Sequence, residues 1–180
     1  MCIRSYDQWG KKGFMKWNLQ GISEERKENL VTTLYLGSIF ILLAVVYSVN
    51  AAHNLVGNVE SLFSTFTLAQ VPGTSVALPA PVNPTAYMTL YIAVFQFCLG
   101  LGILEMMILA LRITLHSPMT RKAETIENLV FWLGTSYLAI TYLVNMTIIS
   151  DWFVFWAGVI LIGGLSLIAR SFVLFFKRQF

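Results

Sequence analysis

The fold of this chain is decided by LVTTLYLGSIFILLAVVYSVN, residues 30–50, in which no charged side chain occurs. About 20 consecutive apolar residues cross the hydrocarbon core of a bilayer as one α-helix. The preceding residues 1–28 mix basic and polar side chains and lack the continuous apolar core of a secretory signal. Residues 30–50 therefore predict a membrane helix that stays in the protein.

Three further apolar stretches follow along the chain. In order, the predicted spans are residues 30–50, 86–112, 128–149 and 152–176. Only 12% of the 180 residues are charged and 57% are hydrophobic, whereas a soluble domain carries about 25% charged residues. We therefore expect an all-α integral membrane protein, with a four-helix transmembrane bundle over residues 30–176.

Basic residues predict the orientation of the spans. All twelve Lys and Arg residues lie before the first span, around the second connection, or at or near the C-terminal end, which includes the tail 177–180. None lies in the first connection, residues 51–85, or in the short connection around Asp151. Because cytoplasmic loops carry an excess of Lys and Arg, both termini are predicted to be cytoplasmic, in a multi-pass protein of the cell membrane. Nucleic acid is not an expected partner, because these residues flank apolar runs and form no basic patch.

The N-terminal segment, residues 1–29, interleaves aromatic and basic residues. This mixture suits a segment that lies on an anionic membrane surface. The residues assigned to the membrane interface are Trp9, Lys11, Lys12, Lys16 and Trp17. An alternative is a tail that docks on the helix bundle or on a neighbouring subunit.

The outer loop, residues 51–85, has Glu60 as its only charged residue. Its first half spaces Leu55, Val59 and Leu62 at roughly helical intervals, which predicts a short helix on the outer surface. Its second half is rich in proline and is expected to be irregular or extended. Two interpretations remain open: a surface loop shaped by its prolines, or a cap over a cavity or a docking surface for a partner.

Glu105 and Arg170 are charged residues placed inside predicted spans. Each lies seven residues from a basic residue at the cytoplasmic end of its span, and hence roughly 10 Å inward. Charge at membrane depth is costly and usually meets a partner or a cavity. We predict a Glu105–Arg170 pair, which is either a clip that fixes helix pairing or part of a gate, proton relay or anion site.

Small residues on spans two and four predict close helix packing. Gly102 shares a face with Glu105, and Gly163 and Ser166 share a face with Arg170. Small side chains let helix backbones approach closely in a membrane. A second stripe on span four, with a spacing of seven residues, consists of Ala157, Gly164 and Ser171. Such stripes pack within a bundle or between protomers, and we expect packing inside the bundle.

Motifs for catalysis or cofactor binding are missing from the sequence. No CxxC, Cys/His cluster, phosphate loop or Ser/His/Asp arrangement can be assembled, so we predict no catalytic residue, metal site or cofactor. The expected function is a non-catalytic subunit or scaffold of a larger membrane complex. The expected partners are the lipid bilayer and other membrane subunits or further copies of the chain. The alternative is a homo-oligomeric transporter or channel for an ion or small solute that uses Glu105 and Arg170. A membrane enzyme or quinone-binding redox protein is a third possibility, disfavoured because suitable ligands are missing.

Overall fold

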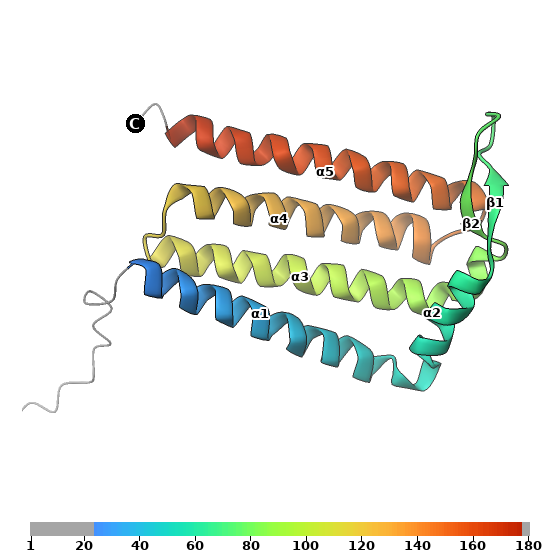
Figure 1. The fold of residues 1–180 in the computed structure, drawn as a ribbon, viewed down its shortest axis with the longest axis horizontal. Helices are drawn as coiled ribbons and strands as arrows, with labels where there is room; N and C mark the ends of the chain where they lie inside the picture. Colours follow the sequence, from blue (N-terminus) through green and yellow to red (C-terminus); the bar gives the residue numbers. More distant parts are fainter. Residues whose placement is uncertain (1–23, 178–180) are drawn as a thin grey trace, which may run out of the picture.

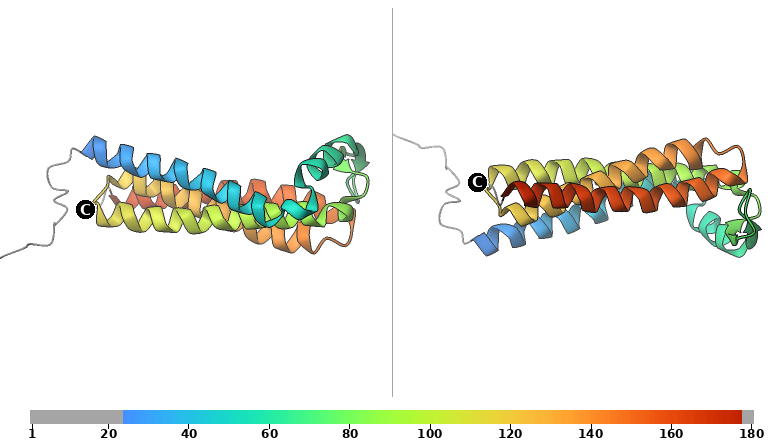
Figure 2. Two further views of the ribbon diagram at one scale, coloured as in Figure 1. Left: turned by 90° about the horizontal axis from the view of Figure 1, so that it is seen from below. Right: turned by 90° about the horizontal axis from the view of Figure 1, so that it is seen from above.

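The structure, a computed structural model, describes residues 24–177, which are mostly helical. Four long helices run side by side (Figure 1): α1 (Glu24–Val49), α3 (Met88–Thr114), α4 (Met119–Leu138) and α5 (Ile149–Lys177). We call the end where α1 begins and α5 finishes the terminal end (Figure 2). The opposite end, which carries the segment between α1 and α3, is called the cap end. The predicted interface residues Trp9, Lys11, Lys12, Lys16 and Trp17 lie outside the described residues.

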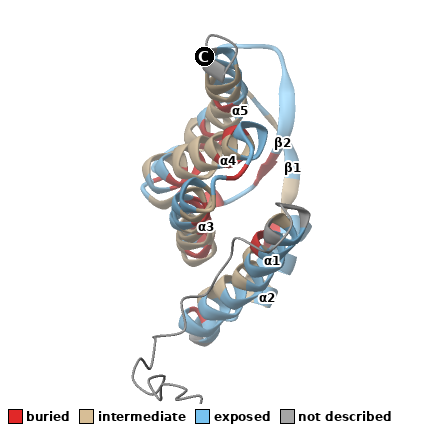
Figure 3. Ribbon diagram, turned by 90° about the vertical axis from the view of Figure 1, so that its left-hand side faces the viewer, coloured by how far each residue is buried: buried red, intermediate tan, exposed pale blue. Residues whose placement is uncertain are grey.

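The long helices are arranged in a row. Helix α3 packs on α1 and on α4, and α5 packs on α4. Figure 3 looks along the helices and displays α5, α4 and α3 in succession, with α1 beyond α3. Two glycines let α3 approach its neighbours: a Cβ added to Gly100 would collide with Leu42 of α1, and one added to Gly102 would collide with Leu133 of α4.

Within residues 24–177, three helical segments are long and apolar enough to cross a membrane: Glu28–Val49, Pro84–Thr114 and Ile149–Phe175. Helix α4 is less apolar, because charged residues from Arg121 to Glu127 lie in its first half. The expectation of an all-α protein that could span a membrane is therefore supported, whereas the four-span bundle is not confirmed.

Helix boundaries also differ from those of the predicted spans. Helix α4 begins at Met119, nine residues before the predicted start of the third span at residue 128. It continues into a π-helix, η4 (Ala139–Val144), and α5 then begins at Ile149. The turn between them is held by Asp151, whose carboxylate accepts backbone N–H bonds from Thr147 and Ile148 at 3.0 and 3.3 Å.

The outer loop folds into a cap over the cap end of the helices (Figure 1). The cap consists of η2 (Ala51–His53), α2 (Leu55–Ser64), β1 (Phe66–Gln70), β2 (Ala77–Pro81) and η3 (Pro84–Tyr87). The expected short helix is present as α2, with Leu62 as its buried residue. The second half, expected to be irregular or extended, is extended: β1 and β2 form an antiparallel pair, in which Phe66 faces Pro81 and Gln70 faces Ala77.

A tight turn explains why these strands form despite their prolines. Thr74 N–H donates to the Val71 carbonyl at 3.1 Å, and Gly73 between them has a φ of 78°. Pro72 and Gly73 thus take the two central positions that a type II turn favours. Proline is tolerated in β2 because this two-stranded sheet has only edge strands, so a missing N–H breaks no central ladder.

The cap is joined to the helices by aromatic side chains. Trp152 of α5 donates its indole N–H to the Pro79 carbonyl at 3.2 Å. The Tyr87 hydroxyl donates to the Ser61 carbonyl at 3.1 Å and lies 2.9 Å from the Thr65 hydroxyl oxygen. Tyr87 and Trp152 belong to a buried cluster that combines Leu62, Ala80, Tyr87, Tyr91, Ala139, Leu143, Met146, Trp152 and Phe155.

Replacing Tyr87 by Phe tests how the cap is held. The change removes both contacts of the hydroxyl and keeps the ring, so local opening of the cap should become easier by about 1–2 kcal/mol. We expect faster amide hydrogen exchange in α2 and β1, with α3 and α5 unchanged. Tyr47→Phe, which alters a half-exposed tyrosine of α1, is the matched control. Equal exchange in both variants would contradict the assigned role of Tyr87.

Candidate functional site

Glu105 is the most deeply buried charged residue of the described chain, with 2% of its surface exposed. It lies on α3, facing both neighbouring helices. From α4, the Asn128 side-chain amide donates to Glu105 Oε1 at 3.0 Å. From α1, the Tyr35 hydroxyl lies within hydrogen-bonding reach of the same carboxyl group. One side chain therefore connects three helices.

Arg112 makes a second set of contacts nearer the terminal end. Its guanidinium donates to the Arg121 carbonyl at 2.6 Å and to the Thr125 hydroxyl, both on α4. On the opposite side, Arg112 lies 3.7 Å from the Glu28 carboxylate of α1. The same three helices thus meet at Arg112 and at Glu105. We call the residues that join these helices the polar layer: Glu28, Tyr35, Glu105, Arg112, Thr125 and Asn128.

Sequence spacing accounts for the two levels of the polar layer. Glu28 and Tyr35 are seven residues apart on α1, and Glu105 and Arg112 are seven residues apart on α3. Seven residues are close to two helical turns, so each pair shares one face of its helix. Because α1 and α3 are antiparallel, Glu28 meets Arg112 and Tyr35 meets Glu105.

Arg170 belongs to a different contact. Its guanidinium donates to Glu127 Oε2 on α4 at 2.9 Å. The side chains of Arg170 and Glu127 are 40% and 21% exposed, so this ion pair is far more accessible than Glu105. It fastens α5 to α4 and stands apart from the contacts with α1.

The predicted Glu105–Arg170 pair is therefore wrong, although both residues do have polar partners. Helix α4 lies between α3 and α5. Its Asn128 side chain binds Glu105 of α3, and its Glu127 side chain binds Arg170 of α5. The prediction assumed a closed bundle in which any two helices can touch. It also treated Glu127 as a boundary of the third span, whereas Glu127 lies two turns inside α4.

The small residues divide between packed and exposed positions. Gly102 packs against Leu133, and Ser166 is buried with its hydroxyl bonded to the Gly163 carbonyl at 2.8 Å. Gly163 itself has no neighbouring atom where a Cβ would lie. The second stripe, Ala157, Gly164 and Ser171, is exposed. It does not pack inside the described chain, because α5 is the last helix of the row.

Of the polar layer, sequence reasoning singled out only Glu105 as a site residue, and it missed Glu28, Tyr35, Arg112, Thr125 and Asn128. Their spacing was the available signal. Asn128 is seven residues from Arg121, whose carbonyl meets Arg112, and this repeats the spacing of Glu105 and Arg112. Reading the helices in antiparallel register would have brought these positions to one level.

The chemistry open to this site is proton exchange and hydrogen bonding. Among residues 24–177, no basic side chain lies within ion-pair distance of Glu105. A buried carboxyl group without such a partner is expensive to ionise, and hydrogen bonds reduce that cost. The same part of the chain contains no group of three His, Cys, Asp or Glu side chains that could hold a metal ion.

The part of the chain that the structure describes belongs to a broad class, α-helical proteins, and contains three candidate membrane-spanning helices. Comparison with known protein families, curated protein sequences and solved structures finds no match to this chain. Arguments about its function therefore rest on its own residues.

A charge exchange distinguishes the observed ion pair from the predicted one. Glu127→Arg or Arg170→Glu alone should lower the free energy of unfolding by about 1–3 kcal/mol, because each leaves like charges facing each other. The double variant Glu127→Arg/Arg170→Glu should recover most of this loss in thermal unfolding followed by circular dichroism in detergent. Glu105→Arg/Arg170→Glu should show no recovery, and recovery in that variant would overturn the assigned partners.

Two substitutions at Glu105 separate hydrogen bonding from charge. Glu105→Gln keeps an acceptor for Asn128 and should unfold within a few tenths of a kcal/mol of the original chain. Glu105→Leu removes the acceptor for Asn128 and Tyr35 and should destabilise the chain by about 1–3 kcal/mol. Thermal unfolding followed by circular dichroism in detergent distinguishes a need for the hydrogen-bond acceptor from a need for the charge. A large loss in Glu105→Gln would mean that the carboxylate charge itself is required.

Proposed function

We propose that this chain is a non-catalytic subunit or scaffold of a larger membrane assembly. The observation that carries the proposal is the row of helices. Each long helix has its main contacts with its neighbours in the row, and α1 and α5 are left at the two edges. Four helices in a row line no central pathway of their own, but they offer two long apolar faces to lipid or to other helices.

Helix α5 supplies the better face for another helix. Its outward side combines the exposed small residues Ala157, Gly164 and Ser171 with large apolar side chains such as Ile160 and Leu161. Small residues at this spacing let a second backbone approach closely, and the neighbouring large residues supply van der Waals contact. This combination favours a partner helix along α5.

The proposal includes a membrane topology. Helix α4 lies between α3 and α5 and runs between the same two ends, so we infer that it crosses the membrane with them as a fourth span. Arg26, Arg112, Arg121, Lys122 and Arg170 all lie toward the terminal end. By the positive-inside rule this end, and with it both termini, faces the cytoplasm of the cell.

Glu105 favours a second candidate function, a homo-oligomeric transporter or channel. A buried carboxyl group in a span commonly marks a route for ions or protons. In this chain Glu105 lies between α1 and α4, while Arg170 is paired elsewhere, so a route would depend on Glu105. Further copies of the chain would have to complete its walls.

The mass and composition of the protein, extracted gently from its native membrane, test the first proposal. We expect the chain to travel with other membrane proteins in a fixed ratio. A homo-oligomer would favour transport, and an isolated monomer would contradict both proposals.

Gly164→Leu should release the partner if α5 is the contact face, because it places a large side chain on the small-residue stripe. Gly37→Leu is the matched control, since Gly37 of α1 also has no neighbouring atom where a Cβ would lie. Release by Gly37→Leu alone would assign the contact to α1 and contradict the role of α5.

A further inference from the structure

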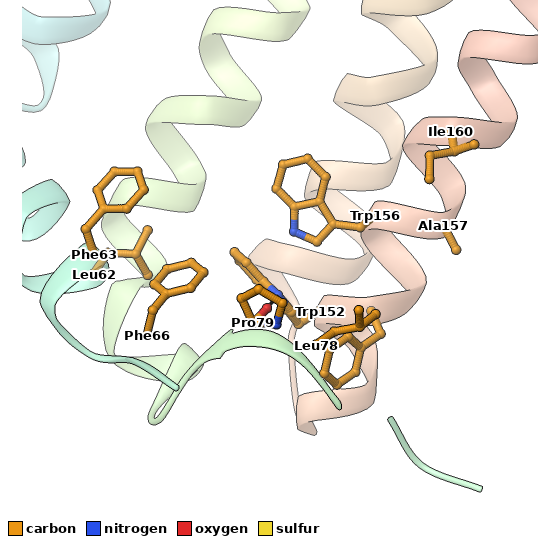
Figure 4. A pocket seen from close by; sticks show the side chains of 10 residues that line it. Leu62, Phe63, Phe66, Leu78, Pro79, Trp152, Trp156, Ala157 and Ile160 are labelled. Carbon is orange, nitrogen blue, oxygen red and sulfur yellow. Dashed lines mark hydrogen bonds between the residues drawn. The ribbon is translucent and has the colours of Figure 1, made fainter. Parts of the chain in front are cut away.

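A cavity of about 600 Å³ lies between the cap and α5 (Figure 4). The cap contributes Phe63 and Phe66 on one side and Leu78 and Pro79 on the other. Helix α5 contributes side chains from Trp152 to Ile160. The volume is in the range of sites that enclose most of a small ligand.

The wall of the cavity is aromatic and aliphatic. Ring contacts run without a break from α2 to α5: Phe63 to Phe66 at 5.8 Å, Phe66 to Trp152 at 5.9 Å, and Trp152 to Trp156 at 5.9 Å. No charged or hydroxyl-bearing side chain lines it. The Trp152 N–H is already bonded to the Pro79 carbonyl. A sugar, nucleotide or ion would find almost no polar partner here, so the wall selects a hydrocarbon.

The mouth of the cavity opens on the lipid-facing side of α5. Trp156 and Ile160 at this rim are 50% and 76% exposed, and both belong to the candidate span Ile149–Phe175. At 1.5 Å per residue they lie roughly 10 and 16 Å along the helix from Ile149. The opening is therefore continuous with the surface that a bilayer covers, at the depth of the lipid tails in one leaflet.

We propose that this cavity holds one hydrocarbon tail of a membrane lipid from the leaflet at the cap end. A volume of about 600 Å³ admits a hydrocarbon chain, whereas a helix of a second copy or of a partner protein is about 10–12 Å across with its side chains, so a lipid tail is the favoured occupant. The tail would lie against the aromatic strip and join the cap to α5. The cavity shares Ala157 and Ile160 with the face of α5 proposed for a partner helix. Gly164 and Ser171 lie on that face outside the cavity, so lipid binding and assembly can be tested separately.

Native mass spectrometry of the full chain in mild detergent tests the proposal, with dioleoylphosphatidylglycerol added in increasing amounts. We expect one lipid per chain to bind tightly before any others. Ala157→Leu fills the cavity from α5 and should weaken this first binding step by about tenfold or more. Gly164→Leu is the matched control, because it adds the same side chain to the same stripe outside the cavity and should leave the first step unchanged.

The effects of Ala157→Leu and Gly164→Leu on lipid binding distinguish a tail in the cavity from other occupants. A first binding step unaffected by Ala157→Leu, or weakened equally by Gly164→Leu, would overturn the proposal in favour of nonspecific lipid. A dimer that Ala157→Leu separates, with no tightly bound lipid at any ratio, would overturn it in favour of a second copy. If Ala157→Leu does not fold, Leu78→Phe fills the cavity from the cap and carries the same expectation. Loss of assembly in Gly164→Leu with lipid binding intact would concern the proposed function alone.

Discussion

The register of α1, α3 and α4 depends on the burial of one carboxyl group. Glu105 is almost inaccessible and has acceptor oxygens that an apolar surrounding cannot satisfy. Asn128 and Tyr35 supply the donors from the two neighbouring helices. Sliding either helix by one turn would remove a donor, whereas the aliphatic contacts along the rest of these helices could re-form in several registers. Arg112, two turns away, repeats the constraint and is joined to α1 and α4 by its own contacts.

The row of helices follows from where these polar contacts lie. Helix α3 uses one side for α1 and the other for α4, and α4 uses Glu127 to hold Arg170 of α5. The ion pairs between long helices in the described residues 24–177 therefore join neighbours in the row, with Arg112 linking α3 to α1 and Arg170 linking α5 to α4. In a bilayer, lipid would solvate the outer faces of such a row. The exposed faces of α1 and α5 are the consequence, and they are what the proposed assembly would use.

At the other end, the cap converts an apolar loop into a folded element. Its backbone groups are paired in α2 and in the strand pair, and the ring of Phe66 lies edge-on against Trp152 of α5. The cap buries Leu62, Ala80, Pro81 and Pro84 against the helix ends. Other apolar side chains of the cap, such as Phe63, Leu68 and Val82, stay exposed, which in water would be unfavourable. The cavity remains where the cap and α5 diverge, and its aromatic walls make it suitable for a hydrocarbon.

The sequence alone determined the helical class, the apolar stretches and the helical half of the cap, because hydrophobic length and helical spacing are local properties of the chain. It also identified Glu105 and Arg170 as residues in need of partners. It could not choose those partners, since the choice depends on which helices are neighbours. The strand pair was missed because several prolines argue locally against a strand, while the turn at Gly73 makes the pairing possible. Only the tertiary structure placed α4 between α3 and α5. Because of this placement, Glu105 pairs with Asn128 and Arg170 pairs with Glu127. Helix order in space is a non-local outcome of packing, so periodicity within each helix does not specify it.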